Sequence, residues 1–282
     1  MKKLFITVAL ILCALTSALL AVSCGNDLTD PEVCTPGLIF SYDNGVYYVS
    51  GYDSTAKNVV IPEYYDDDEN GRAKVEYIGE SAFAYANILS VKLPDSIKSI
   101  EKTAFYGCTK LEGIELPKKL ESIGDAAFCG CEGIKSITLP SSLTKIGDSA
   151  FAMSGLGSLN IPKKVSVIKQ AFVSNCASLT EITVDAGNES FSAQNGDLYS
   201  KDGTKLIAYA PGKNEETPSF PEKVTSYAPY AFSMAPNMVS FTIPSSVTEI
   251  SAFAFEGCEK LDPNALLNLN FKSRANIIFG LK

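Results

Sequence analysis

The sequence predicts a β-rich solenoid, in which short parallel strands from successive repeats of about 23 residues stack in a curved sheet. Two recurring marks carry this prediction. The first is an Ala-Phe pair that recurs once in each of seven repeats and ends at Phe83, Phe105, Phe128, Phe151, Phe172, Phe232 and Phe255. The second is an aliphatic residue followed by proline, at Pro94, Pro117, Pro140, Pro162 and Pro244. Both marks keep a nearly constant spacing except across one long gap, which indicates a repeat array rather than two average domains.

One repeat illustrates the expected structure. Residues 134–139 place aliphatic side chains at near-alternating positions, which predicts a short strand. Pro140 ends this strand because proline cannot donate to the hydrogen-bond ladder. The chain then runs back through residues 143–146, and the Ala150-Phe151 pair enters the interior. A single repeat cannot bury its own apolar face, so stacked repeats must share one core.

The repeat region spans residues 75–261, and both of its ends are irregular. Residues 38–74 are predicted to form an N-terminal β cap, with strands on either side of the turn Asp43-Asn44-Gly45. Residues 262–282 lose the repeat and are expected to cap the other end. Residues 185–220 interrupt the period, and the Asp202-Gly203 pair within them predicts a β-hairpin. We expect this insertion to project from the solenoid.

The N-terminal segment is predicted to be an export signal. Lys2 and Lys3 precede an almost wholly apolar stretch, so residues 1–23 are assigned to a signal peptide, with a transmembrane anchor as the alternative. The stretch from Leu20 to Cys24 resembles a bacterial lipobox. That resemblance implies lipidation of Cys24, with residues 24–37 as a flexible tether.

The repeat unit Ile-Gly-x-x-Ala-Phe-x-x-Cys-x-x-Leu-x-x-Ile-x-Leu-Pro resembles the BspA-like leucine-rich-repeat surface lipoproteins of the Bacteroidetes type. The resemblance covers residues 38–261. It implies a leucine-rich-repeat solenoid on the outer membrane, exposed at the cell surface. It also implies binding of a protein partner in host or cell-cell adhesion. A glycan-capture lipoprotein that supports nutrient uptake is the alternative.

Composition argues against several other functions. The formal net charge is −8, which disfavours nucleic acid, and we expect membrane contact only through the lipid on Cys24. The chain has no histidine, which removes the Ser-His-Asp and Cys-His nucleophile systems. No phosphate loop or carboxylate dyad stands out. We therefore expect no enzymatic activity and no cofactor.

Two motifs could in principle hold a metal. Cys108, Cys131, Cys176 and Cys258 share one repeat position, where they are either buried free thiols or disulfide partners of a neighbouring repeat. The run from Asp66 to Gly71 resembles the start of a calcium loop, but Tyr77 stands where a bidentate glutamate belongs. We therefore predict no metal site.

Two surfaces could bind a ligand. Outward-facing positions of successive strands should align as one row on the sheet face. This row consists of Lys92, Glu115, Thr138, Asn160, Thr183 and Thr242. It contains none of the aromatic side chains that dominate binding hot spots. Tyr199 and Tyr209 of the insertion would supply such side chains if they are exposed.

Overall fold

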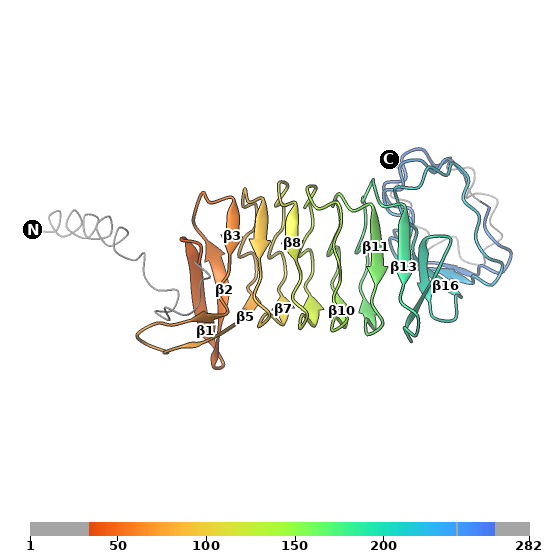
Figure 1. Cartoon of the computed structure of the whole chain (residues 1–282). Helices are drawn as coiled ribbons and strands as arrows, with labels where there is room; N and C mark the ends of the chain where they lie inside the picture. Colours follow the sequence, from red (N-terminus) through yellow and green to blue (C-terminus); the bar gives the residue numbers. More distant parts are fainter. Residues whose placement is uncertain (1–33, 241, 263–282) are drawn as a thin grey trace, which may run out of the picture.

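The computed structural model describes residues 34–240 and 242–262, and it confirms the leucine-rich-repeat solenoid. The described chain makes about eight turns and contains no helix (Figure 1). The expectations for the signal peptide and for Cys24 lie outside the described residues, as does nearly all of the expected C-terminal cap.

A first sheet runs along one edge of the solenoid. Its strands, in the order in which they pair, are β1 (Leu38–Asp43), β2 (Val46–Tyr52), β5 (Ala73–Ile78), β7 (Ser99–Ile100), β9 (Ser122–Ile123), β10 (Lys145–Ile146) and β12 (Val167–Ile168), with β4 (Tyr64–Tyr65) beside β5. The strands β1 and β2 form an antiparallel hairpin around Asn44 and Gly45, as the sequence predicts. From β2 to β12 the pairing is parallel, since each turn contributes one equivalent segment.

A second set of short parallel strands forms the broad face that carries the predicted row. It consists of a three-stranded sheet, β3 (Asn58–Val60), β6 (Ser90–Lys92) and β8 (Gly113–Glu115), and a two-stranded sheet, β11 (Ser158–Ile161) and β13 (Glu181–Val184). Residues 135–139 lie between these sheets without strand pairing, and farther along Ser219 and Thr242 form an isolated parallel bridge. The face is therefore discontinuous.

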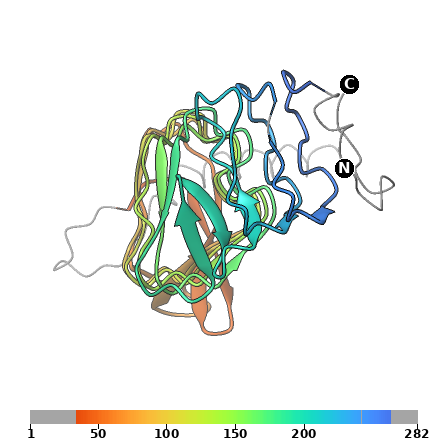
Figure 2. The ribbon, with the colours of Figure 1, turned by 90° about the vertical axis from the view of Figure 1, so that its right-hand side faces the viewer.

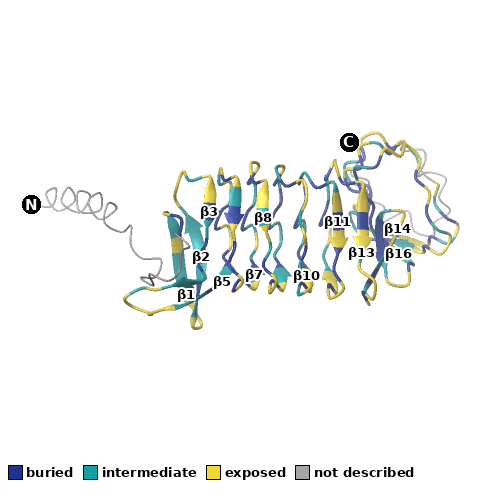
Figure 3. Ribbon diagram, in the orientation of Figure 1, coloured by how far each residue is buried: buried dark blue, intermediate teal, exposed yellow. Residues whose placement is uncertain are grey.

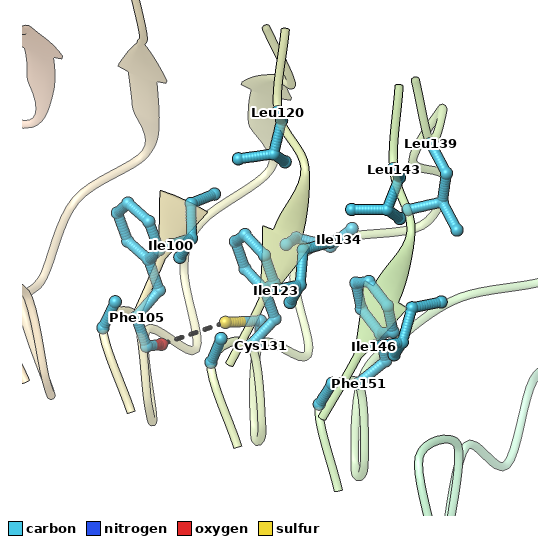
Figure 4. Close-up of a cluster of buried hydrophobic side chains, with 14 of the residues drawn as sticks. Ile100, Phe105, Leu120, Ile123, Cys131, Ile134, Leu139, Leu143, Ile146 and Phe151 are labelled. Carbon is cyan, nitrogen blue, oxygen red and sulfur yellow. Dashed lines mark hydrogen bonds between the residues drawn. The ribbon is translucent and has the colours of Figure 1, made fainter. Parts of the chain in front are cut away.

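The phenylalanines of the Ala-Phe pairs form a column in the interior. The rings of Phe83, Phe105, Phe128 and Phe151 stack nearly parallel, with centroids 5.1, 5.3 and 5.6 Å apart. Isoleucines of the first sheet pack around these rings, as Figure 4 shows for Ile100, Ile123 and Ile146. In these four turns one ring per turn thus fills the core, and the small alanine beside it leaves room for the ring.

The fifth repeat departs from this register by one residue. In the other repeats, the residue before the Ala-Phe alanine has a positive φ, as at Ser149, whereas in the fifth repeat Ala171 itself has a φ of 54°. The hydrogen bonds agree, because Phe128 N–H donates to the carbonyl of Ala150 but Phe151 N–H donates to that of Phe172. Phe172 therefore occupies the alanine position and Val173 the ring position.

The insertion is part of the stack, so the expectation that it projects is wrong. Its strands β14 (Phe191–Gln194), β15 (Asp197–Ser200) and β16 (Lys205–Ala208) form an antiparallel meander. The predicted hairpin turn is present, with the Asp202 carboxylate accepting the Thr204 N–H at 3.0 Å. Beyond it, β16 pairs in parallel with β17 (Ser226–Tyr227), which pairs with β18 (Glu249–Ile250).

The meander separates two hydrophobic cores. Leu198 and Ala208 pack in the core of the earlier turns, while their neighbours Tyr199 and Tyr209 pack in the core of the last turns. This arrangement follows from the alternation of side chains along a strand. Viewed end-on, the earlier turns superimpose, whereas the last turns are displaced sideways (Figure 2). The solenoid therefore bends at the insertion.

Candidate functional site

The predicted row on the broad face is exposed at every position. Lys92, Glu115, Thr138, Asn160, Thr183 and Thr242 are all exposed, and the face carries many exposed residues along its length (Figure 3). Lys92 is in register with Glu115, and Asn160 with Thr183. The Thr183 hydroxyl donates to Asn160 Oδ1 at 2.9 Å, and Asn160 Nδ2 donates to Asp185 Oδ1 at 2.9 Å. These side chains therefore use part of their hydrogen-bonding capacity on one another. The row also crosses a face whose strands do not form one continuous sheet.

The two insertion tyrosines are not available to a ligand. Tyr199 and Tyr209 are each 2 % exposed, so the expectation that they supply exposed aromatic side chains is wrong. They are buried because the insertion lies between two cores, and both of its faces are covered.

A buried ion pair lies within the insertion, between the β15 strand and the segment that follows β16. Lys213 Nζ lies 2.8 Å from Asp197 Oδ1, and both side chains are less than a tenth exposed. Asp197 also accepts the Ala210 N–H at 3.0 Å, and Lys213 lies over the Tyr209 ring, 4.9 Å from its centroid. Burial raises the pKa of Asp197 to about 6, against the opposing effect of the Lys213 ammonium.

The repeated cysteines are free thiols. Each thiol donates to the carbonyl of the ring-position residue in the preceding turn, at 3.0 Å from Cys108 to Phe83 and 3.1 Å from Cys131 to Phe105 (Figure 4). Cys176 and Cys258 make the same contact with Phe151 and Phe232. Burial raises the pKa of the Cys108 thiol to about 12 and that of Cys258 to about 11.

The acidic loop at residues 66–71 is closed by its own side chains. Asp67 Oδ1 accepts the Glu69 and Asn70 N–H groups at 3.0 and 2.6 Å, and these hydrogen bonds, that from Asn70 foremost, lower the pKa of the carboxyl. This is the contact of a turn residue. Within the described ranges, no group of three or more histidine, cysteine or acidic side chains is placed to hold a metal ion.

A concave surface lies at the bend. It is a groove of about 1030 Å³, which we call the bend groove, lined by Cys129 and by residues from the four segments 148–153, 170–175, 230–234 and 256–259. These segments are the Ala-Phe edges of two turns before the insertion and two turns after it. A hydrogen bond of 2.7 Å between the Ser174 and Ser233 hydroxyls joins the two sides.

Apolar and acidic side chains share this groove. Met153 and Met234 line it and are 42 % and 36 % exposed. Tyr230 also lines it and stacks on Phe253, whose ring centroid is 5.4 Å away. The lining includes Asp148, Glu256 and Glu259 but no lysine or arginine. Lys169 Nζ lies 3.0 Å from Asp148, outside the lining.

The sequence contains two traces of the bend groove, although they do not identify it. The spacing of 21 residues between Phe151 and Phe172 is the shortest in the array, and the next spacing is the longest. Both irregular spacings fall at the bend, where the Ala-Phe edges of the earlier turns separate from those of the last turns. The groove itself depends on the angle between the two stacks, which the spacing of the repeat marks does not give.

Comparisons with known proteins agree with the repeat architecture. The sequence matches the family model for the BspA-type leucine-rich repeat region, in six copies over residues 76–195 and 209–279. No curated protein matches the sequence. Among solved structures, the pneumococcal vaccine antigen PcpA is similar at 26% identity with a TM-score of 0.65, covering 82% of this chain and 68% of that one.

Two further structures are similar. A leucine-rich repeat protein from Bacteroides ovatus has 25% identity and a TM-score of 0.58, over 82% of this chain and 64% of that one. A leucine-rich cell surface protein from Faecalibacterium prausnitzii has 23% identity and a TM-score of 0.54, over 83% and 76%, and this likeness concerns the fold alone. In residues 34–240 and 242–262 there is no helix of the length and apolar character needed to span a membrane.

Proposed function

Because the chain belongs to the BspA-type leucine-rich repeat family, we propose that it is an exported, lipid-anchored surface protein that binds a protein partner in host or cell-cell adhesion. Such repeats generally serve as non-catalytic binding scaffolds. The observation that carries the proposal is the bend groove, an open concavity of about 1030 Å³ with exposed methionines on both of its sides.

The size of the groove favours a polypeptide over a small molecule. Small-molecule pockets are clefts or cavities of about 300–1,000 Å³ that enclose most of their ligand, whereas the bend groove is open and, at about 1030 Å³, lies just above that range. Exposed methionine is common at protein-binding surfaces because its flexible, polarisable side chain adapts to a partner. The exposed row from Lys92 to Thr242 is proposed as a second contact surface.

Export and anchoring rest on the N-terminal sequence. The positive start, the apolar stretch and Cys24 after small residues support a signal peptide that is removed at a lipidated cysteine. Several acyl chains on Cys24 would hold the protein on the outer membrane.

Protease shaving of intact cells, followed by detection of the chain, tests the location. Degradation of the chain is expected, and protection would place it away from the surface and refute direct adhesion. Crosslinking at the surface of intact cells tests binding, and recovery of no partner would count against the whole proposal. Replacement of Cys24 by alanine should release the chain from the membrane fraction.

Glycan capture is a second candidate. The stacked pair of Tyr230 and Phe253 favours it, because partly exposed aromatic rings can pack against sugar rings. A glycan array probed with the mature chain distinguishes the two functions. Reproducible, saturable binding to one glycan class would favour nutrient capture, and silence on the array would leave the protein-binding proposal.

A further inference from the structure

We propose that the bend groove receives a cationic, apolar segment of the partner protein, in which lysine or arginine stands beside an aliphatic or aromatic residue. This inference rests on the proposed function and names the chemistry of its partner. It follows from the charges, the apolar side chains and the backbone of the groove.

The charge of the groove is unbalanced in one direction. Of its three acidic residues, Asp148 is matched by Lys169 at 3.0 Å. Glu256 and Glu259 have no such match, since neither forms an ion pair with any residue in the described part of the chain. Lys260 follows Glu259 in sequence but does not line the groove. Two carboxylates on one wall therefore favour positive charge in the occupant.

The apolar lining lies beside these carboxylates. The Met234 side chain rests on Gly257, next to Glu256, and an added Cβ at Gly257 would overlap the Met234 sulfur. Met153 faces the groove from the earlier turns, and Tyr230 contributes from the later ones. An occupant that satisfies both features must place a positive charge within a few ångströms of an apolar side chain.

The backbone is strained at both of these methionines. Met153 and Met234 occupy the left-handed region, with φ values of 56° and 60°, a conformation that methionine rarely adopts. Asparagine adopts this conformation more readily, and Asn175 takes the same repeat position in the fifth repeat with a φ of 57°. Local strain of this kind is often kept where a side chain serves binding.

The chain itself offers a rival occupant. Residues 263–282 contain Lys272, Arg274 and Lys282 among many apolar residues and contain no acidic residue. This segment follows Glu259 closely in sequence, so its chemistry also suits the groove. The experiment must therefore separate an external segment from this internal one.

The test is fluorescence anisotropy with the mature chain, residues 24–282, and three labelled 12-residue peptides. The first alternates lysine and leucine, the second replaces lysine with glutamate, and the third replaces leucine with serine. We expect only the first to bind, with an affinity that falls as salt rises. Glu256→Gln with Glu259→Gln should weaken this binding about 3- to 20-fold, as expected for two partly exposed ion pairs.

Matched variants control for folding and for net charge. Met153→Asn and Met234→Asn should each weaken binding by at least about 5-fold, while Tyr85→Asn, at the same repeat position outside the groove, should leave it unchanged. Glu112→Gln with Glu181→Gln makes the same charge change on exposed residues that do not line the groove, and it should also have no effect.

Three outcomes would overturn the inference. Equal binding of the glutamate peptide would remove the charge argument, and equal loss in the control pair would make the effect non-specific. Tighter peptide binding after Lys272→Gln, Arg274→Gln and Lys282→Gln would show that the chain fills its own groove. The proposed function is tested separately, by crosslinking on intact cells. A partner that crosslinks equally well to the Glu256→Gln, Glu259→Gln variant would refute this inference but leave the proposed function standing.

Discussion

Removal of Lys213 should destabilise the junction between the two cores in a pH-dependent way. Lys213→Met deletes the cation that lies 2.8 Å from Asp197 but keeps an unbranched apolar side chain of similar length. The carboxylate would remain buried with only the Ala210 N–H as a described hydrogen-bond donor. Removing one partner of a buried ion pair costs about 3–5 kcal/mol. We therefore expect Lys213→Met to lower the free energy of unfolding by about that amount at pH 7.5.

The sign of the pH dependence follows from the pKa of Asp197. Its folded pKa of about 6 lies above the ordinary aspartate value of 3.8, so the folded state binds the proton more tightly than the unfolded state does. In the wild type, the contribution of this group to stability is therefore greatest below about pH 4 and is lost as the pH rises through about 6, a difference of about 3 kcal/mol. Loss of Lys213 raises this pKa further, so Lys213→Met should be much less damaging at pH 5 than at pH 7.5.

Urea unfolding followed by far-UV circular dichroism and tyrosine fluorescence measures this effect, since the chain has no tryptophan. Asp197→Asn with Lys213→Met is the matched control, because the amide oxygen of asparagine can still accept the Ala210 N–H without carrying a charge. It should recover most of the stability at pH 7.5. A loss for Lys213→Met that is equal at both pH values, or a double variant no better than the single one, would refute the reasoning.

Three further predictions concern the interior. Phe128→Ala removes a ring stacked between those of Phe105 and Phe151, and it should lower the free energy of unfolding by about 3–5 kcal/mol; a loss under 1 kcal/mol in urea unfolding would contradict the packing. The buried Tyr227 hydroxyl has no hydrogen-bond partner among the described residues, so Tyr227→Phe should keep or raise the melting temperature, and a clear drop would reveal a hidden partner. Burial raises the pKa of the Cys108, Cys131, Cys176 and Cys258 thiols, so Ellman's reagent at pH 8 should label them only after denaturation, whereas rapid labelling of the native chain would place them at the surface.

The repeat marks were sufficient to predict the architecture, because each mark has one physical role. The phenylalanine fills the interior of a turn, and the proline ends a strand, so their spacing gives the length of the turn. The same marks misled at Phe172, where the Ala-Phe pair is present but displaced by one residue. In this repeat the residue with the positive φ, Ala171, marks which residues take the alanine and ring positions, and the Ala-Phe pair does not.

The candidate site was harder to predict. The outward positions of the row, such as Asn160 and Thr183, follow from strand alternation, and the structure exposes them. The prediction that Tyr199 and Tyr209 are exposed failed because the insertion has a core on each side. Side chains that alternate along its strands are therefore buried on both faces. The bend groove depends on how two stacks meet, which involves residues as far apart in sequence as Asp148 and Glu259.

Hydrogen–deuterium exchange of the mature chain, with and without the lysine-leucine peptide, tests the central claim most directly. If the partner segment binds in the bend groove, protection should appear on the four groove segments, residues 148–153, 170–175, 230–234 and 256–259. The broad face should exchange at an unchanged rate. Protection confined to that face, at residues 90–92, 113–115, 158–161 and 181–184, would contradict the account and assign binding to the row of outward side chains.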